Sequence, residues 1–278
     1  MSIIIEKKTP NNLQQKIKVI SWNLDINKKN TQRKISELIE KNPDIIMLQE
    51  CTERISEKFT NYISYSSTSS HKGLIKLLIH KRIGSQLVNL FKDNGILIYH
   101  LDTKFGQIIV ASIHLPPFNK INDKILRTIT IYKIVNFIKK ENLINFPIII
   151  GGDTNMQDDE HIGNLSEDIL EDLYDNFGCE NNYHTWPTRI QQLNGKLINK
   201  FRFDRFFYSN LTVKNFKTWM SNNSNHCMIE TDICFNKTSK DSINLKLEKL
   251  QNKNKKTFLN DYLTNSFNSF YLLKNTDN

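Results

Sequence analysis

The sequence predicts a mixed α/β protein whose core consists of two β-sheets. Two observations lead to this fold class. In the first part of the chain, apolar runs with β-branched residues alternate with segments whose apolar residues have helical spacing. Through the middle of the chain, the apolar runs follow one another more closely. The first pattern is typical of strands connected through helices, and the second of strands that pair with their neighbours.

Strands are expected where short apolar runs are rich in β-branched residues. In chain order these runs are IKVISWNL (17–24), DIIMLQE (44–50), LIKLLIHKRI (74–83), GILIYHLDT (95–103), IIVASIHL (108–115), PIIIGGD (147–153), FRFDRFFYS (201–209) and MIETDICF (228–235). Two helices are expected between them. TQRKISELIEKN (31–42) begins with Thr31 as its N-cap, and ILRTITIYKIVNFIKKENL (125–143) is a longer amphipathic helix.

The chain of 278 residues is long enough for one large domain with a sizeable core. We expect an N-terminal extension at 1–16, one main domain at 17–235 and a C-terminal tail at 236–278. The tail contains the basic, polar run KLEKLQNKNKK. Beyond that run, FLNDYLTNSF has the apolar spacing of a short amphipathic helix, which we expect to dock on the domain or on a partner that the sequence does not identify.

Composition narrows the class of protein. The formal net charge of +9 favours phosphate-rich partners, because basic side chains attract phosphates and release their counterions. No apolar run approaches the length of a membrane span, and the N-terminal apolar run is too short for a secretory signal. We therefore expect an intracellular monomer, nuclear or cytoplasmic rather than secreted. None of the cysteines forms a CxxC pair, so we expect ordinary thiols at Cys51, Cys179, Cys227 and Cys234.

Polar residues collect at the ends of the expected strands. They are Asn23, Gln49, Glu50, His114, Asp153, Asn155, Asp204, Asn225 and His226. Each has an ordinary explanation by itself, such as a turn, a solvated strand end or an Asx turn. In layered α/β proteins, however, strand ends converge on one edge, where sites are built. The whole set therefore indicates a functional site.

Part of this set is suited to a metal ion. Glu50 offers a carboxylate oxygen, and Asn23 offers a neutral oxygen. Mg²⁺ prefers such hard ligands and keeps several waters, which leaves room for a phosphate. We expect Mg²⁺ as the cofactor, with Mn²⁺ as an alternative.

The other part is suited to proton transfer. Asp153 could take a proton from an attacking water, and Asn155 could hold that water or the phosphate. His226 could donate to a phosphate oxygen, with Asp204 fixing its tautomer, and His114 could add a second donor. Together with the metal, these groups predict metal-assisted phosphodiester hydrolysis.

Two features mark the end of the strand at 147–153 and the residues after it. Gly151 and Gly152 are expected to let the backbone turn sharply, so that Asp153 and Asn155 face the site. The acidic run at 158–160 is expected to be a helix start or a solvated turn rather than a set of ligands.

The order of the motifs WN, LQE, HL, GDTN, FDR and NH resembles that of the endonuclease/exonuclease/phosphatase superfamily, over residues 17 to 235. The segments HTWPT (184–188), KFRFDRFF (200–207) and GLIKLLIHKRI (73–83) look most similar to its 5′-tyrosyl-DNA phosphodiesterase branch. The resemblance implies a four-layer fold, a two-sheet β-sandwich flanked by helices.

The resemblance also implies roles for individual residues. Glu50 would bind Mg²⁺ with Asn23 beside it, Asp153 and Asn155 would activate and place the water, and Asp204 would orient His226 against the phosphate. Substrate contacts are expected from Trp186, whose ring could stack on a base, and from Arg205 and Thr154 within the FDR and GDTN motifs.

Three positions depart from the family pattern. Asn225 stands where the family has an aspartate, so it can ligate a metal only as a neutral amide, and we expect weaker metal affinity or the loss of a second metal. Pro116 and Pro117 follow the HL motif in place of Glu-Ser. Gln157 replaces an arginine. The last two changes affect substrate contacts.

The leading hypothesis is therefore a Mg²⁺-dependent phosphodiesterase that acts on a nucleic-acid end, in the manner of a DNA-repair enzyme. Its substrate would be a 5′-phosphotyrosyl link between DNA or RNA and a peptide. Other substrates remain open: an abasic site, an RNA 3′ end, or a phosphoinositide or sphingolipid. A non-catalytic protein that binds nucleic acid or protein is the alternative from a different class.

Overall fold

The computed structural model describes residues 16–27, 30–69, 71–118, 120–157, 160, 169–177, 185–187 and 200–235. The chain divides into two compact units, Met1–Asn236 and Lys237–Asn278. All described residues belong to the first unit. The amphipathic helix predicted in the tail, and residues 1–15 of the predicted extension at 1–16, lie outside the described residues. The predicted domain limits therefore stay a prediction. Among the described helices, none is long and apolar enough to cross a membrane.

The first sheet has six strands in the order β13-β14-β1-β2-β4-β3. Their bounds are β1 Lys16–Asn23, β2 Ile45–Cys51, β3 Tyr62–Thr68, β4 Leu74–His80, β13 Leu211–Trp219 and β14 Met228–Phe235. β1 and β2 run parallel, and the other neighbours are antiparallel. The parallel pair at the centre is connected through the helix α1 (Thr31–Lys41), as expected for a βαβ unit.

The second sheet also has six strands, in the order β5-β6-β7-β8-β12-β9. Their bounds are β5 Gln86–Asp93, β6 Ile96–Thr103, β7 Gly106–His114, β8 Ile148–Asp153, β9 Glu171–Asp172 and β12 Asp204–Ser209. The parallel pair β7 and β8 again lies at the centre, and the helix α2 (Ile121–Lys140) connects these two strands. Each sheet therefore has six strands with a parallel pair at its centre, connected through a helix.

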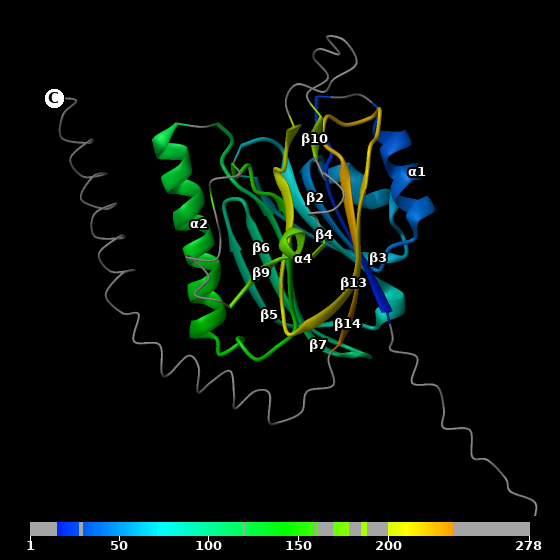
Figure 1. The fold of residues 1–278 in the computed structure, drawn as a ribbon. Helices are drawn as coiled ribbons and strands as arrows, with labels where there is room; N and C mark the ends of the chain where they lie inside the picture. Colours follow the sequence, from blue (N-terminus) through cyan, green and yellow to red (C-terminus); the bar gives the residue numbers. More distant parts are fainter. Residues whose placement is uncertain are drawn as a thin grey trace, which may run out of the picture. The chain divides into compact units, whose positions relative to one another are not determined.

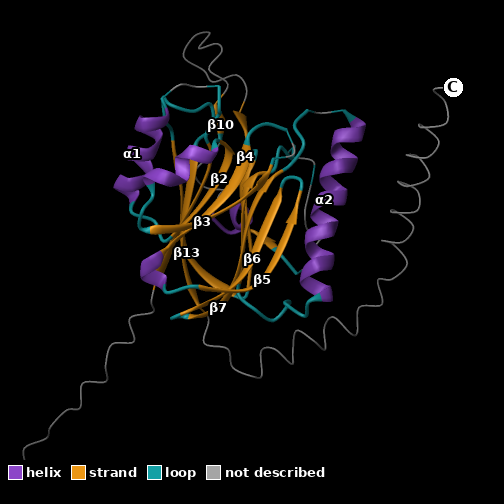
Figure 2. Ribbon diagram, turned by 180° about the vertical axis from the view of Figure 1, so that it is seen from behind, coloured by secondary structure: helices purple, strands orange, loops and turns teal. Residues whose placement is uncertain are grey.

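Three apolar clusters define four layers. The largest lies between the sheets and contains Met47 and Val110 from their central strands. A second joins Ile35 and Leu38 of α1 to the outer face of the first sheet. The third joins α2, through residues such as Ile134, to the outer face of the second sheet. Figures 1 and 2 show α1 and α2 on opposite sides of the paired sheets. The predicted two-sheet sandwich flanked by helices is confirmed.

The shorter elements are two 3-10 helices, η1 (Glu53–Lys58) and η2 (Lys81–Ile83), the helix α4 (Leu173–Phe177), and the two-stranded pair of β10 (Trp186–Pro187) with β11 (Lys200–Phe201). The strand expected at 74–83 ends at His80 and continues as η2. The strand expected at 201–209 is divided, with Phe201 in β11 and β12 beginning at Asp204.

Sequence patterns did not indicate β3, β5 or β13. All three are edge strands of their sheets. An edge strand is partly exposed, so its sequence is mixed, as in YISYSST and QLVNLFKD, and it lacks the continuous apolar run of a central strand.

The two helices differ in detail from the prediction. Thr31 is the first residue of α1 rather than its N-cap, which is Asn30 and makes no side-chain capping bond. The left-handed residue Asn42 ends that helix, and its N–H donates to the Ile39 carbonyl at 2.9 Å. α2 begins at Ile121, one turn earlier than its apolar pattern indicated.

The glycine pair has a different purpose from the one predicted. Gly151 and Gly152 lie inside β8, which continues to Asp153, so they do not form a turn. A methyl group at Gly152 would lie 1.9 Å from the carbonyl oxygen of Ile113 in β7. A methyl group at Gly151 would lie 2.5 Å from the Phe206 ring. The glycines are needed for the close approach of neighbouring chain segments beside the site.

We predict that Gly152→Ala lowers the free energy of unfolding by about 3 kcal/mol or more, because the new methyl group overlaps a backbone carbonyl that cannot move freely. Urea unfolding followed by circular dichroism would measure this loss. Gly84→Ala is the control, since its nearest neighbour would be at 3.9 Å, and we expect a cost of about 1 kcal/mol from its left-handed backbone alone. Equal losses in the two variants would contradict the close-approach explanation.

Candidate active site

Strand register places three of the predicted residues in one row. Asp153 at the end of β8 pairs with His114 at the end of β7 on one side. It pairs with Asp204 at the start of β12 on the other side. All three side chains are buried. The second sheet therefore presents an imidazole and two carboxylates at one edge.

The first sheet meets this row through Asn23, the last residue of β1. Its amide Nδ2 donates a hydrogen bond to Asp153 Oδ2 at 2.8 Å. Its Oδ1 accepts from the backbone N–H of Asp25 at 2.9 Å. Ser224, in the loop before β14, donates to the Asn23 carbonyl at 2.7 Å. The same edge of both sheets thus forms one buried polar site.

Glu50 is presented by an irregularity in β2. The pairing of β2 with β4 shifts register between Leu48 and Cys51, and Glu50 has a φ of 47°. A side chain in this left-handed region is strained, and such strain is concentrated at functional sites. Gly73 makes the bulge feasible, because an added methyl group there would lie 2.9 Å from the Cys51 carbonyl oxygen. The bulge turns Glu50 towards the row of the second sheet.

The Glu50 carboxylate is well shielded but accepts no hydrogen bond from any described residue. Its side chain is 13% exposed, and Oε1 lies 4.0 Å from His114 Nε2. Leaving a shielded carboxylate without donors costs free energy unless a cation compensates for it. The Glu50 carboxylate is therefore a suitable ligand for a divalent cation.

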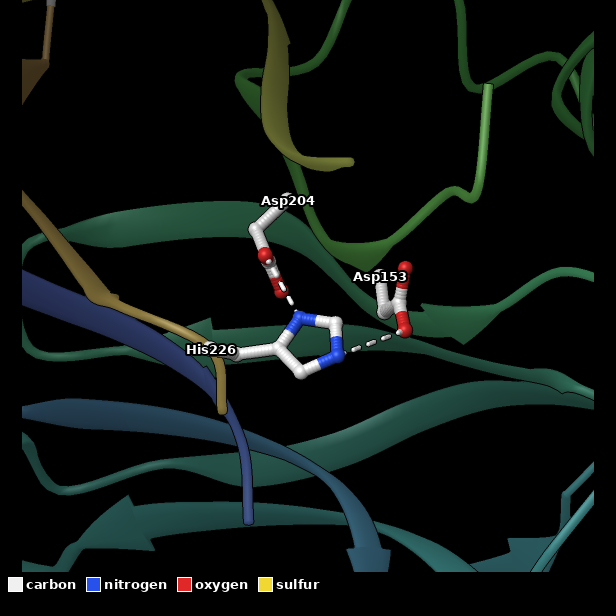
Figure 3. Close-up of side chains that lie close together, drawn as sticks. All are labelled: Asp153, Asp204 and His226. Carbon is white, nitrogen blue, oxygen red and sulfur yellow. Dashed lines mark hydrogen bonds and ion pairs between the residues drawn. The ribbon is translucent and has the colours of Figure 1, made fainter. Parts of the chain in front are cut away.

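His226 lies between two carboxylates, as Figure 3 shows. Its Nδ1 donates to Asp204 Oδ2 at 2.9 Å, and its Nε2 faces Asp153 Oδ2 at 3.8 Å. Burial alone would lower the pKa of His226, but Asp204 and Asp153 reverse the effect and raise its pKa to about 9. Burial also raises the pKa of the Asp204 carboxyl, to about 6, against the attraction of His226. Near neutral pH the pair is therefore a carboxylate and an imidazolium.

The surroundings of His226 fix its position. Its backbone N–H donates to Ser224 Oγ at 3.1 Å, and its backbone carbonyl accepts from the indole N–H of Trp22 at 3.1 Å. The N–H of Asp204 donates to Thr185 Oγ1 at 2.9 Å. Asp204 Oδ1 is buried and has no hydrogen-bond partner among the described residues.

His114 has the opposite protonation. Burial lowers its pKa, and the attraction of Asp153 and Glu50 does not compensate. Its Nδ1 lies 2.5 Å from Ser69 Oγ, and its Nε2 lies 3.6 Å from Asp153 Oδ2. One neutral and one charged imidazole therefore flank the same carboxylate.

Asn155 also occupies a strained position, with a φ of 49°. Its Nδ2 donates to the Leu115 carbonyl at 3.0 Å, and its N–H donates to Asp153 Oδ1 at 3.1 Å. These bonds orient the amide so that its oxygen can accept a hydrogen bond from a water or donor near Asp153.

The three residues predicted to contact substrate differ in placement. The Trp186 ring lies against the His226 ring, with centroids 4.9 Å apart, and is partly exposed. Thr154 is buried, and its hydroxyl donates to the Phe203 carbonyl at 2.7 Å. Arg205 is buried as well and donates to the carbonyls of Met156 and Gln157 at 3.2 and 3.1 Å. Thr154 and Arg205 thus donate hydrogen bonds to the protein's own backbone. Their contacts with substrate stay predictions.

The remaining predicted positions also have defined places. Asn225 is partly exposed in the loop directly before His226. Glu160 is not a solvated turn residue: it forms a two-point ion pair with the buried Arg127, at 2.9 and 2.7 Å. Asp158 and Asp159 lie outside the described residues. Cys51, Cys227 and Cys234 are buried free thiols, and Cys179 also lies outside the described part of the chain.

The described residues contain a second group that could hold a metal ion, besides the predicted one. Asp153, Asp204 and His226 each offer a ligand atom, and these atoms lie within 4.8 Å of one another, so the group could hold a metal ion. The predicted set was Glu50, Asn23 and Asn225. The two sets belong to the same site, since Asn23 is bonded to Asp153.

Sequence reasoning missed the residues that support the site. Ser69, Ser224, Thr185 and Trp22 contact its histidines or Asp204, and Lys34, buried in α1, donates to the carbonyl of Asp25 at 3.1 Å. Ser224 lies two residues from His226, so proximity to the NH motif could have indicated it. Trp22 precedes Asn23 in the WN motif and Thr185 lies in the HTWPT segment, so these motifs could have indicated both. Ser69 and Lys34 carry no local signal, because only the fold brings about their contacts.

Comparisons with solved structures identify the fold. TDP2 of D. rerio, humanised by 14 mutations, matches with a TM-score of 0.64 and 20% identity, covering 78% of this chain and 98% of that one. D. rerio TDP2 complexed with single strand DNA product matches with a TM-score of 0.64 and 18% identity, covering 79% and 99%.

Two further structures have the same architecture. An endonuclease/exonuclease/phosphatase family protein from Bacteroides thetaiotaomicron matches with a TM-score of 0.61 and 15% identity, covering 80% and 98%. The human Nocturnin catalytic domain with bound sulfate matches with a TM-score of 0.62 and 18% identity, covering 81% and 96%. The chain therefore has the endonuclease/exonuclease/phosphatase fold. No family model and no curated protein matches its sequence.

We predict that the metal-free protein keeps His226 protonated up to about pH 9, because Asp204 and Asp153 stabilise the imidazolium. NMR titration of the imidazole signals would measure this pKa. Asp204→Asn should move it downwards, since burial then opposes the charge with less compensation. His114 is the internal control and should titrate below its ordinary value. A His226 pKa near 6.5 in the native protein would contradict the pairing.

Proposed function

We propose that the protein is a metal-dependent phosphodiesterase that hydrolyses a phosphodiester at a nucleic-acid end. The observation that carries this proposal is the buried series Asp204–His226–Asp153, which lies at the same edge as Glu50 and Asn155. It combines a charged donor, a carboxylate base and a shielded carboxylate for a cation. These are the groups that stabilise charge and transfer protons in phosphoryl chemistry.

The cation is proposed to be Mg²⁺, held by Glu50 with Asn23 and Asn225 beside it. Asp153, Asp204 and His226 also form a candidate group, but His226 is a cation there and already donates to Asp204. A protonated imidazole must lose its proton before it can ligate a metal. The Glu50 carboxylate accepts no hydrogen bond from any described residue and lies 4.0 Å from His114 Nε2. When bound, the cation supplies Lewis-acid stabilisation of a phosphate oxygen.

Asp153 and Asn155 are proposed to handle the attacking water. Asp153 Oδ2 accepts from Asn23, which fixes the direction of the carboxylate. The carboxylate can take a proton from a water whose other hydrogen bond is made to the Asn155 amide oxygen. A correctly positioned base contributes about 10²–10⁴ to the rate.

His226 is proposed to stabilise the negative charge that develops on the phosphate. Its Nε2–H points to the same region as Asp153, and Asp204 holds the ring and its charge. Neutral His114 can donate or accept a hydrogen bond without adding charge. The site thus offers one cationic donor to the phosphate and keeps one carboxylate available as a base.

Three observations favour a nucleic-acid substrate. D. rerio TDP2, which shares the fold, was crystallised with a single strand DNA product. This chain carries a net charge of +9 and places the partly exposed Trp186 ring against His226. Within this class we propose a 5′-phosphotyrosyl end as substrate and a DNA-repair role in the nucleus or cytoplasm, with abasic, RNA and phospholipid phosphodiesters as the alternatives.

We predict Mg²⁺-dependent cleavage of a 5′-phosphotyrosyl oligonucleotide to a 5′-phosphate under single-turnover conditions. Asp153→Ala should lower the rate by about 10²–10⁴, because it removes the base. EDTA should abolish product formation. Leu87→Ala is the control, since this exposed residue lies on the edge strand β5.

The outcomes separate the substrates. Cleavage of abasic or RNA substrates without the tyrosyl substrate would retain the chemistry and reject the tyrosyl assignment. Product that is insensitive to EDTA would reject the metal. Failure of folded protein to cleave any phosphodiester would reject the proposed function.

We predict that Glu50→Gln weakens Mn²⁺ binding, measured by electron paramagnetic resonance, on the order of 100-fold. Asp204→Asn should change it much less, because Asp204 orients His226 rather than binding the cation. Asn225→Asp should strengthen binding by adding a charged ligand beside the site. The reverse order, with Asp204→Asn the more damaging variant, would place the ion in the Asp153, Asp204 and His226 group instead.

A further inference from the structure

Phe118 is an exposed aromatic residue in a strained conformation. It follows β7 and the His114 end of the site by a few residues, and its side chain is 64% exposed. Its φ is 80°, in the region where a bulky side chain is a genuine outlier. Glycine would fit that backbone without strain. Neither burial nor backbone preference explains a phenylalanine at this position.

A buried ion pair holds this conformation. Arg127 of α2 donates through Nη1 to the carbonyls of Pro116 and Phe118, at 2.9 and 2.8 Å. The other side of the guanidinium is bound by Glu160, which also accepts from the Gln157 N–H at 2.9 Å. The Arg127 side chain is 1% exposed. The loops that follow β7 and β8 are thus fixed by one pair, which keeps the Phe118 ring at the surface.

The Phe118 ring is linked to His114 of the site by contacts through His71 and Ser69. The Phe118 and His71 rings meet edge to face, with centroids 5.7 Å apart. The His71 N–H donates to Ser69 Oγ at 3.2 Å, and Ser69 Oγ lies 2.5 Å from His114 Nδ1. Phe118 therefore lies on the His114 side of the site, whereas Trp186 contacts His226.

The chemistry around the two rings fits a nucleic-acid strand. Lys72 and Lys120 are exposed and lie within two residues of His71 and Phe118. Binding grooves for single strands combine basic residues along the backbone with aromatic faces for the bases. An exposed apolar residue alone needs no explanation. An exposed, strained aromatic residue beside lysines and a phosphodiesterase site does.

We propose that Phe118, supported by His71, is a base-stacking platform for a single-stranded nucleic-acid substrate, and that the Arg127–Glu160 pair is its positioning clamp. This inference rests on the proposed function for its substrate class. It assigns to this chain a specificity residue in the segment where Pro116 and Pro117 depart from the family pattern.

The test is binding of a fluorescent single-stranded oligonucleotide of about ten nucleotides, a length within the usual site size, followed by anisotropy. The full-length protein would carry Asp153→Asn, so that it binds without turnover in Mg²⁺. Adding Phe118→Gly should raise Kd by about five- to 150-fold, the effect expected from the loss of one stacked base. Phe118→Trp should keep native affinity, and Phe118→Leu should not.

A second readout separates stacking from a structural role. Phe118→Gly relieves the left-handed strain, so its Tm should be equal to or above that of the parent protein. A lower Tm together with weaker binding would indicate a structural role and overturn the proposal. Leu87→Ala is the matched control, because Leu87 is 46% exposed but pairs with Leu101, about 20 Å along the sheet from the site.

Substrates lacking single bases locate the contact. Replacing one nucleoside of the oligonucleotide by an abasic unit should remove the effect of Phe118→Gly at the stacked position only. An unchanged Kd in Phe118→Gly with every oligonucleotide would overturn the proposal. So would an effect confined to binding of anionic phospholipid vesicles. If the native protein binds the oligonucleotide through Phe118 but cleaves no phosphodiester, the platform stands and the proposed function fails.

Discussion

The hydrogen bond from Asn23 to Asp153 is the constraint on which the rest of the site depends. It is buried, it joins the last residue of a central strand in one sheet to the last residue of a central strand in the other, and it measures 2.8 Å. A buried bond to a charged group contributes about 1.5–3 kcal/mol. Because it fixes where the two sheets end relative to each other, it also fixes where Glu50 lies relative to Asp153, and hence where a cation and a base could act on one substrate.

Around that bond, the fold brings strained backbone and buried charge together. Glu50 and Asn155 have left-handed backbones; Glu50 lies near the end of the apolar strand β2, and Asn155 lies two residues after the apolar strand β8. Three carboxylates meet within a shielded space, a costly arrangement that the charged His226 only partly offsets. Such a site persists because the two sheets, each covered by a helix, provide a rigid support. A bound cation would neutralise the shielded carboxylate of Glu50.

The sequence predicted the central strands, both helices and the principal polar residues, but not the edge strands or the supporting contacts. Asp153, Asp204 and His114 could be recognised because each ends or begins an apolar run. Ser69 could not, since it lies in no motif and acts through a partner 45 residues away. Thr185 lies in the HTWPT segment, but its bond to Asp204, 19 residues away, depends on the fold. The turn predicted at the glycine pair is wrong: side chains are excluded there by the Ile113 carbonyl of the neighbouring strand β7 and by the Phe206 ring.

By itself, the sequence determined which reactive side chains are present and that they lie at the ends of strands. Both can be recognised locally, from the spacing of apolar residues and the polar residues that follow them. Only the tertiary structure decided which of these groups meet. It placed His226 between Asp204 and Asp153, and it turned Glu50 towards them through a bulge that Gly73 permits. It bonded Arg205 to backbone carbonyls. It also kept Phe118 at the surface, where Arg127 binds the Phe118 carbonyl. Each of these results depends on register and packing between segments far apart in the chain, and no local pattern encodes such distances.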